Sequence, residues 1–333
     1  MIRTLDIGGV LAPTNLVLSP MSGVTDCAFR SLVREMSGPA LGLVVSEFIS
    51  SEGLTRANPK TLAMLRFKES ERPVSIQIFG ADVDRMARAA EMVEEAGADI
   101  VDVNCGCPAP KVVRRGGGAE LMRQPGRLGA ILRAIKRRVS VPMTVKIRSG
   151  WDDDSLNALD IARLAADEGA SMLAVHGRTR RALYTGQADW DLVARIKAEL
   201  PIPVIGSGDL SGPDAVLSRL AESGADGVMI GRAAIDNPWI FAQVSRRAAG
   251  LAVEPPTPAQ RVESVSRFRE LLAETLEKRA YIGRLRGVSC RLVKTMPGSA
   301  SIRQAIGRAV DGAEVVDIVR GALMSERPLA EVA

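Results

Sequence analysis

The sequence predicts a (β/α)8 barrel of the TIM type followed by a small all-α C-terminal domain. Eight short apolar runs, rich in β-branched residues, recur between positions 15 and 230, and helical patterns lie between most of them. Apolar runs without alternation are typical of parallel strands that are covered on both faces. Eight units of about thirty residues fill roughly 240 residues, the usual length of such a barrel. A doubly wound sheet is the alternative, and the lack of a G-x-G-x-x-G motif after the first strand disfavours it.

Predicted strands and helices alternate along the first 230 residues. The strands occupy residues 15–18, 43–46, 74–78, 100–103, 143–147, 172–175, 203–205 and 227–230. The clearest helical patterns occupy residues 83–96, 127–138, 156–168, 190–200 and 213–223. Three of these helical patterns are followed by Gly97, Gly169 and Gly224, and a glycine just past the end of a helix is the expected cap.

The composition indicates a globular protein. Of the 333 residues, 46% are hydrophobic and 25% are charged, and the length suggests about two domains. No run of apolar residues is long enough for a membrane span, and the first residues lack the pattern of a signal peptide. We therefore expect a cytoplasmic protein. The four cysteines show no framework spacing and there is one histidine, so neither disulfides nor a metal site is expected.

The character of the chain changes after Arg232. The segment 254–258, which holds three prolines, is typical of a stiff linker. A helix over 260–279 and two or three further helices are predicted beyond it, so we divide the chain into a barrel, 1–250, and a helical domain, 251–333. Between Lys278 and Arg308 there are eight basic residues and no acidic one. Clustering of one sign is typical of a polyanion-binding surface, although a solvated helical face would carry the same charges.

Polar or conformationally special residues follow all eight predicted strands. In a barrel of this type the chemistry lies at the carboxyl ends of the strands. The residues found there are Ser19-Pro20-Met21, Ser46-Glu47, Gln77, 104–108, 146–148, 176–178, 206–209 and Gly231-Arg232. Packing alone would not require such residues at every strand end. The glycines after strands 7 and 8 lie where barrels bind phosphate, although they would also suit tight turns.

Two basic side chains at strand ends suggest a ligand. Lys146 interrupts an apolar strand, and a buried ammonium group needs an anionic or hydrogen-bonding partner. That partner is either a structural carboxylate, such as Glu47 or Asp102, or a ligand that becomes negative during the reaction, such as a reduced flavin. His176 is the only histidine. Its place at a strand end, close to two arginines, favours contact with a ligand.

Cys107 stands in a loop rich in glycine and basic residues, 106–118. A thiol with an ordinary pKa of about 8.5 is mostly protonated at neutral pH, so Cys107 can donate a proton. A nucleophilic role would need a paired base, and the one histidine lies two strands away. A small buried cysteine is the structural alternative, and it suits Cys105 better than Cys107.

Together these stretches resemble the tRNA-dihydrouridine synthases, and most closely their bacterial B-type. The resemblance extends from about residue 9 to about residue 320. Its most specific part is Asn104-Cys105-Gly106-Cys107-Pro108. The other matching stretches are 19–26, 77–80, 146–151, 176–180 and 230–233.

The resemblance implies an FMN enzyme that reduces the C5–C6 bond of a uridine in tRNA with NADPH. Cys107 would give the proton to C5 after a hydride from flavin N5 has reached C6, a general-acid role. Asn104 and Arg178 would contact the uracil, while Lys111 and Arg286 would contact the tRNA. The FMN contacts implied are Ser19, Pro20, Met21, Gln77, Lys146, His176, Ser207, Gly208, Asp209, Gly231 and Arg232. No obligate protein partner is expected.

The chain departs from the family pattern at several positions. The family usually has Ala, Met and Asn where this chain has Ser19, Cys105 and Ser207. In the segment 286–292 the family carries Arg-Lys-His and then Trp-Tyr, and only Arg286 clearly matches. We expect arginines to replace the missing RNA contacts by binding phosphates.

Two other functions are consistent with parts of the sequence. A flavin barrel acting on a free pyrimidine would need the same strand ends, but the basic helical tail disfavours it. An RNA-binding protein whose catalysis has decayed would not need Cys107, Lys146 and His176.

Overall fold

The computed structural model describes residues 2–276, 278–294, 296 and 298–324 of the chain. The side chains of Lys278 and Arg279, two members of the basic run, lie outside this description, as does the end of the predicted helical domain, 325–333.

Eight parallel strands close into a barrel, so the predicted fold is confirmed. In order around the barrel they are β3 (Leu16–Leu18), β4 (Leu43–Val45), β6 (Val74–Phe79), β7 (Ile100–Cys105), β8 (Met143–Arg148), β9 (Met172–His176), β10 (Val204–Ser207) and β11 (Gly227–Ile230). The pairing of β11 with β3, with Met229 opposite Val17, closes the ring. A short strand, β5 (Ile49–Ser50), continues the sheet beside the end of β6. Because all strands run the same way, their carboxyl ends meet at one mouth.

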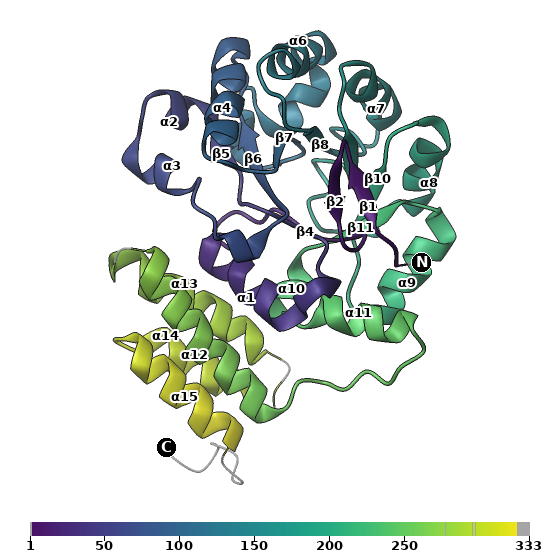
Figure 1. Cartoon of the computed structure of the whole chain (residues 1–333). Coiled ribbons are helices and arrows are strands. Elements are labelled where there is room, and N and C mark those ends of the chain that lie inside the picture. The colour runs from purple at the N-terminus through teal and green to yellow at the C-terminus, as the bar shows by residue number, and fades with distance from the viewer. Residues whose placement is uncertain (1, 277, 295, 297, 325–333) are drawn as a thin grey trace.

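Helices cover the outside of the barrel (Figure 1). They are α1 (Cys27–Ser37), α2 (Ser51–Thr55), α3 (Pro59–Ala63), α4 (Val83–Glu95), α5 (Pro110–Val113), α6 (Pro125–Lys136), α7 (Ala158–Asp167), α8 (Trp190–Glu199), α9 (Pro213–Ser223), α10 (Arg232–Asp236) and α11 (Ile240–Ala248), with the 3-10 turns η1 (Gly38–Ala40), η2 (Glu69–Glu71) and η3 (Gly118–Arg123). Asp26, Asp82 and Asp189 cap α1, α4 and α8 by accepting a backbone N–H. Such caps satisfy donors that a helix N-terminus leaves unpaired.

A β-hairpin that the sequence did not predict closes the amino end of the barrel. It consists of β1 (Leu5–Ile7) and β2 (Val10–Ala12), and it lies across the strands in Figure 1. Leu5 and Ile7 pack with inward-facing residues of the strands, among them Val17 and Met172, in a separate buried cluster. Since this end is filled by apolar side chains, access to the barrel interior is from the carboxyl ends of the strands.

The C-terminal part is a bundle of helices beside the barrel (Figure 1). The bundle consists of α12 (Pro258–Thr275), α13 (Lys278–Leu292), α14 (Ser299–Arg308) and α15 (Gly312–Met324). Phe268 of α12 meets Phe29 of α1 edge to face, with 6.2 Å between ring centroids. The predicted helix 260–279 is wrong at its end, because the backbone becomes extended at Leu276. The predicted domain division at 250/251 falls between α11 and α12 and stays a prediction.

Among the described residues, no helix is both long and apolar enough to cross a bilayer. Within the same residues, no group of three or more His, Cys, Asp or Glu side chains is arranged to hold a metal ion.

Candidate active site

A cavity of about 1290 Å³ opens at the carboxyl ends of the barrel strands. The strands bring together most of the predicted site residues there, although these residues are far apart in the sequence. Those that line the cavity are Ser19, Pro20, Met21, Asn104, Cys107, Lys146, His176, Ser207, Gly208, Asp209, Gly231 and Arg232. Gln77, Lys111, Arg178 and Arg286 do not line it.

Gln77 lies in a buried chain of hydrogen bonds beneath the cavity. Its amide nitrogen donates to Asp102 Oδ2 at 2.5 Å, and its amide oxygen accepts from Asn104 Nδ2 at 2.7 Å. Asn104 Oδ1 in turn accepts the backbone N–H of Cys107 at 2.9 Å. Buried polar groups that satisfy one another hold a fixed geometry. The chain therefore fixes the start of the Cys107 loop relative to β6 and β7.

Cys107 lies at the cavity wall, and its thiol is protonated at neutral pH. Burial raises the pKa of the Cys107 thiol, and this outweighs the N–H of Ala109 and the positive charges of Arg148 and Lys146, which favour the thiolate. The carbonyl of Cys107 accepts the N–H of Ala119 at 3.1 Å, so the loop folds back on its own start. A protonated thiol held in this way can serve as an acid but is a poor nucleophile.

Lys146 is a deeply placed cation that lines the cavity. The charge of Asp102 favours its ammonium form, but no ion pair within 4 Å joins it to Asp102, Glu47 or any other described residue. Burial, followed by the charge of Arg148, lowers the pKa of Lys146 to about 8. The group is therefore mostly charged at pH 7, and a ligand with negative charge would stabilise it.

His176 is a neutral imidazole. Burial, together with the cations Lys146, Arg148, Arg178 and Arg232, lowers the pKa of His176 to about 2. A neutral imidazole has one donor and one acceptor nitrogen, so it can hydrogen-bond a ligand without adding charge.

Arg178 is buried behind the cavity and does not line it. Its side chain is 3% exposed and forms an ion pair with Asp209 at 2.7 Å. The same guanidinium donates to the carbonyls of Thr185 at 3.0 Å and Gly186 at 2.6 Å. Arg178 therefore holds the loop after β9 in place, and contact with a substrate base stays a prediction.

Tyr184, which the sequence analysis did not identify, lies over the mouth from that loop. It is 56% exposed, and its ring is 4.6 Å from the guanidinium carbon of Arg232 and 6.3 Å from the ring of His176. Arg148 donates to the carbonyls of Thr179 and Leu183, which fixes the loop that carries Tyr184. An exposed aromatic ring at a cavity is a stacking surface for a planar ligand.

Near the ends of β10 and β11 the cavity is bordered by glycine backbone, and at Gly208 a side chain would not fit. Gly208 has φ +119°, and a Cβ there would lie 2.5 Å from Ala188 Cβ. Gly208 and Gly231 leave backbone surface open beside Ser207 and Arg232. Open backbone, a hydroxyl and a guanidinium are a suitable donor set for a phosphate group.

The two remaining predicted contact residues, Lys111 and Arg286, lie away from the cavity. Lys111 is exposed on α5, outside the cavity. Arg286 lies in α13 and donates to the carbonyl of Ala309, inside the helical bundle. Three cations of the helical domain that the sequence analysis did not assign to the site do line the cavity: Arg261, Arg291 and Lys294.

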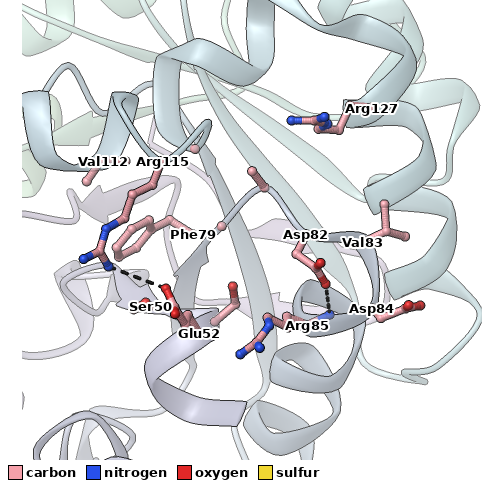
Figure 2. A pocket seen from close by; sticks show the side chains of 14 residues that line it. Ser50, Glu52, Phe79, Asp82, Val83, Asp84, Arg85, Val112, Arg115 and Arg127 are labelled. Atoms are coloured by element: carbon pink, nitrogen blue, oxygen red, sulfur yellow. Dashed lines mark hydrogen bonds and ion pairs between the residues drawn. The ribbon is translucent and has the colours of Figure 1, made fainter. Parts of the chain in front are cut away.

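A second, smaller pocket of about 560 Å³ lies outside the barrel between α2, α4 and α5. Figure 2 shows Arg115 reaching toward Glu52, with 3.6 Å between their charged atoms, and Asp82 capping the backbone of Arg85. Positive and negative side chains are balanced here, and no predicted site residue lines the pocket.

The comparisons with known proteins agree with this architecture. The family model described as dihydrouridine synthase matches residues 17–326. The chain is 37% identical over 311 residues to tRNA-dihydrouridine synthase B of Pseudomonas aeruginosa, covering 92% of this chain and 91% of the relative. It is 36% identical over 335 residues to the probable tRNA-dihydrouridine synthase of Rhodobacter capsulatus, covering 98% of this chain and 100% of the relative.

Solved structures with a similar fold are distant in sequence. A 2-naphthoyl-CoA reductase complex matches with a TM-score of 0.58 at 14% identity, covering 75% of this chain and 52% of that chain. Morphinone reductase in complex with tetrahydroNAD matches with a TM-score of 0.52 at 15% identity, covering 77% of this chain and 92% of that chain. At this level of identity the likeness shows the fold.

Proposed function

The chain belongs to the dihydrouridine synthase family, and we propose that it is an FMN-dependent enzyme that reduces uridines in tRNA to 5,6-dihydrouridine, with NADPH as reductant. One observation carries the proposal. The barrel holds a protonated thiol, Cys107, and a cation that forms no ion pair with a described residue, Lys146, in one cavity that opens at the mouth. Both features suit a reduction in which negative charge develops and a proton is then delivered.

The residues present fit FMN. The charge of Asp102 compensates the burial of Lys146 only in part, so Lys146 can meet a negative ligand, and His176 offers a neutral hydrogen bond beside it. Ser207, Gly208 and Arg232, with Gly231, would hold the phosphate, and Ser19, Pro20 and Met21 would line one side of the ring. When bound and reduced, FMN supplies a hydride for C6 of the uracil.

The residues of the protein would bind the uracil base and supply the proton. A uracil stacked in RNA is out of reach, so the nucleotide must leave the stack and enter the mouth. Tyr184 and Arg148 at the mouth, together with Asn104, would hold the base. Addition at C6 leaves an enolate because the 4-carbonyl accepts the electron pair, and the Cys107 thiol then protonates C5. We expect the enzyme to work in the cytoplasm with tRNA as its partner.

The cysteine to alanine change at position 107 tests the proposal. Cys107→Ala should lower dihydrouridine formation on tRNA by about 100-fold or more, the usual contribution of a general acid. Reduction of the bound flavin by NADPH, measured by bleaching of its absorbance, should be unchanged. Cys290→Ala is the matched control, because Cys290 lies in α13 outside the cavity.

Two results would contradict the proposal in different ways. An unchanged rate of uridine reduction in Cys107→Ala would remove Cys107 as the acid. Reduction or oxidation of free uracil or orotate, with none on tRNA, would favour the free-pyrimidine alternative.

A further inference from the structure

The side-chain amide of Asn104, which lines the cavity, has one hydrogen-bonding group to offer a ligand. Its oxygen, Oδ1, accepts the backbone N–H of Gly106 at 3.2 Å and that of Cys107 at 2.9 Å. An amide oxygen has two lone pairs, and both are then in use. Its nitrogen, Nδ2, donates one of two hydrogens to Gln77 Oε1 at 2.7 Å. Among the contacts of the described residues, this leaves one N–H of Asn104 for a ligand in the cavity.

The backbone fixes the direction of these hydrogen bonds. A backbone N–H only donates, so the atom of Asn104 that meets Gly106 and Cys107 must be its oxygen. The nitrogen of Asn104 therefore meets Gln77, and Gln77 must accept with its own oxygen. The nitrogen of Gln77 is then turned to Asp102, whose Oδ2 accepts from it at 2.5 Å. The chain thus needs an acceptor, not a donor, at position 102.

Asp102 supplies this acceptor from inside the sheet. In the register of the barrel it lies between Gln77 of β6 and Thr144 of β8. It is 2% exposed, and its second oxygen, Oδ1, accepts the hydroxyl of Thr144 at 2.5 Å. Asp102 does not line the cavity, so it can affect the hydrogen bonds of a substrate only through its neighbours. Buried polar groups that satisfy one another hold a fixed geometry, so Asp102 keeps Gln77, and through it Asn104, in one orientation.

The place of the remaining N–H indicates which atom of a base it would meet. Cys107 would protonate C5, and Asn104 holds the backbone N–H of Cys107, so its amide would lie on the C5 side of the ring. The exocyclic group next to C5 is the one on C4. Uracil has an acceptor there, the carbonyl oxygen O4, whereas cytosine has an amino group, which donates. An N–H of Asn104 therefore suits uracil and opposes cytosine.

We propose that Asp102 is a positioning residue that makes Asn104 present an N–H to position 4 of the pyrimidine, so that the site selects uracil over cytosine. This inference rests on the proposed function. A site that is built to hydrogen-bond one group rejects a base that leaves its polar groups unpaired. The same N–H would stabilise the negative charge that O4 gains after addition at C6.

The test measures which base reaches the cavity of the complete flavin-loaded enzyme. The probes are short single-stranded RNAs made only of uridine or only of cytidine, and the change in flavin absorbance gives their Kd values. We expect the wild type to bind the uridine RNA about tenfold more tightly, the discrimination of one good hydrogen-bonded pair. Asp102→Val removes the acceptor and should reduce this ratio to about two, because Asn104 is then held less firmly. With tRNA, its kcat should fall by about tenfold and its KM should change little, because Asp102 does not touch the RNA.

Two variants around the same carboxylate separate this role from a loss of folding. Asp102→Asn keeps one oxygen to accept from Gln77 and can donate to the Thr144 hydroxyl, so it should keep the wild-type ratio. Thr144→Val is the matched control. It removes one buried hydrogen bond to Asp102 but leaves the chain to Asn104 intact, so it should also keep the ratio. Equal ratios for Asp102→Val and Thr144→Val would overturn the inference.

Asn104→Asp is a second test that does not depend on the folding of Asp102→Val. Its carboxyl group still accepts the backbone N–H of Cys107 but has no N–H for a base, so the preference should shift toward the cytidine RNA. An unchanged preference for the uridine RNA in this variant would overturn the inference, as would a wild type that does not distinguish the two RNAs. If the wild type preferred the uridine RNA but formed no dihydrouridine in tRNA, the proposed function would fail while the ratio of Kd values still decided the inference.

Discussion

Burial shifts the pKa values of two side chains, Lys146 and Asp26, in opposite directions. It lowers the pKa of Lys146 to about 8 and raises the pKa of Asp26 to about 6. In both cases the low-dielectric surroundings disfavour the charged form, and the nearby opposite charges only partly compensate. Lys146 serves the cavity, whereas Asp26 caps α1 and faces Arg284 of the bundle at 3.4 Å.

The shift at Asp26 predicts how stability depends on pH. The folded pKa of about 6 lies above the ordinary value of 3.8, so the folded state binds the proton more tightly. The resulting stabilisation is complete below the unfolded pKa and is lost as pH rises through the folded pKa. We expect the free energy of unfolding to fall by about 3 kcal/mol between roughly pH 4 and pH 6 from this group.

Urea titration at several pH values measures this effect. Asp26→Asn keeps a good helix cap and removes the titrating group, so it should flatten the profile in that window relative to wild type. Asp153→Asn, in an exposed loop, is the control and should leave the profile unchanged. A profile for Asp26→Asn that runs parallel to wild type would contradict the prediction.

At the level of single residues the sequence identified groups that follow from the strand ends and missed contacts that depend on how the loops and the helical bundle fold. Cys107, Lys146 and His176 lie at strand ends, and closure of the barrel alone brings strand ends together. Arg178 and Arg286 were assigned from position, but their guanidinium groups bond carbonyls whose location depends on the tertiary fold. Tyr184 was missed for the same reason, because its place over the mouth depends on how the loop after β9 folds.

Elements were predicted well where they are long and poorly where they are short. The five helices predicted between strands correspond to α4, α6, α7, α8 and α9. The three-residue strands of the β1–β2 hairpin are too short for a periodicity to show. At Leu276 the helical pattern continues on both sides of an extended residue, so the sequence gives no sign of the break.

Arg284 is one of the side chains that connect helix α13 to the barrel. It forms ion pairs with Asp26 at 3.4 Å and Glu47 at 3.2 Å, and these carboxylates are 10% and 12% exposed. Gly23, with φ +74°, allows the close approach, since a Cβ there would lie 2.9 Å from Arg284. Glu47 also accepts the N–H of Gly23 at 2.7 Å, so Arg284 braces the turn after β3 that borders the cavity.

We expect Arg284→Gln to destabilise the protein by about 2 kcal/mol, because it leaves two mostly buried carboxylates without their cation. Arg320→Gln is the matched control. It removes an exposed ion pair with Asp317, and such pairs contribute about 0.5 kcal/mol or less. Urea denaturation of the purified variants measures both. Equal losses of stability in the two variants would show that Arg284 does not brace the turn.

At the scale of the whole molecule, the site lies between the barrel and the helical bundle. The sequence predicts each of these parts, but it does not predict how they pack together. The strand–helix repeat predicts the barrel, and the proline-rich segment followed by helices predicts the second part. Their contact depends on side chains such as Phe268 and Phe29, which are 6.2 Å apart between ring centroids. No sequence period encodes such a contact, so the extension of the cavity to the bundle emerged from the structure.

The cavity also predicts how the whole molecule responds to flavin. A ligand that binds only the folded state at 100 times its Kd adds about 2.7 kcal/mol, which raises the melting temperature by roughly 5 °C in a protein of this size.

Lys146→Gln should have two effects of opposite sign. The apoprotein should be at least as stable as wild type, because a buried cation is removed, while the stabilisation by FMN should shrink. Thermal melts of the apoprotein with and without FMN measure both effects, with Lys136→Gln as the control. An undiminished FMN shift in Lys146→Gln would mean that this cation does not meet the flavin, and the fit of the cavity to FMN would lose its main support.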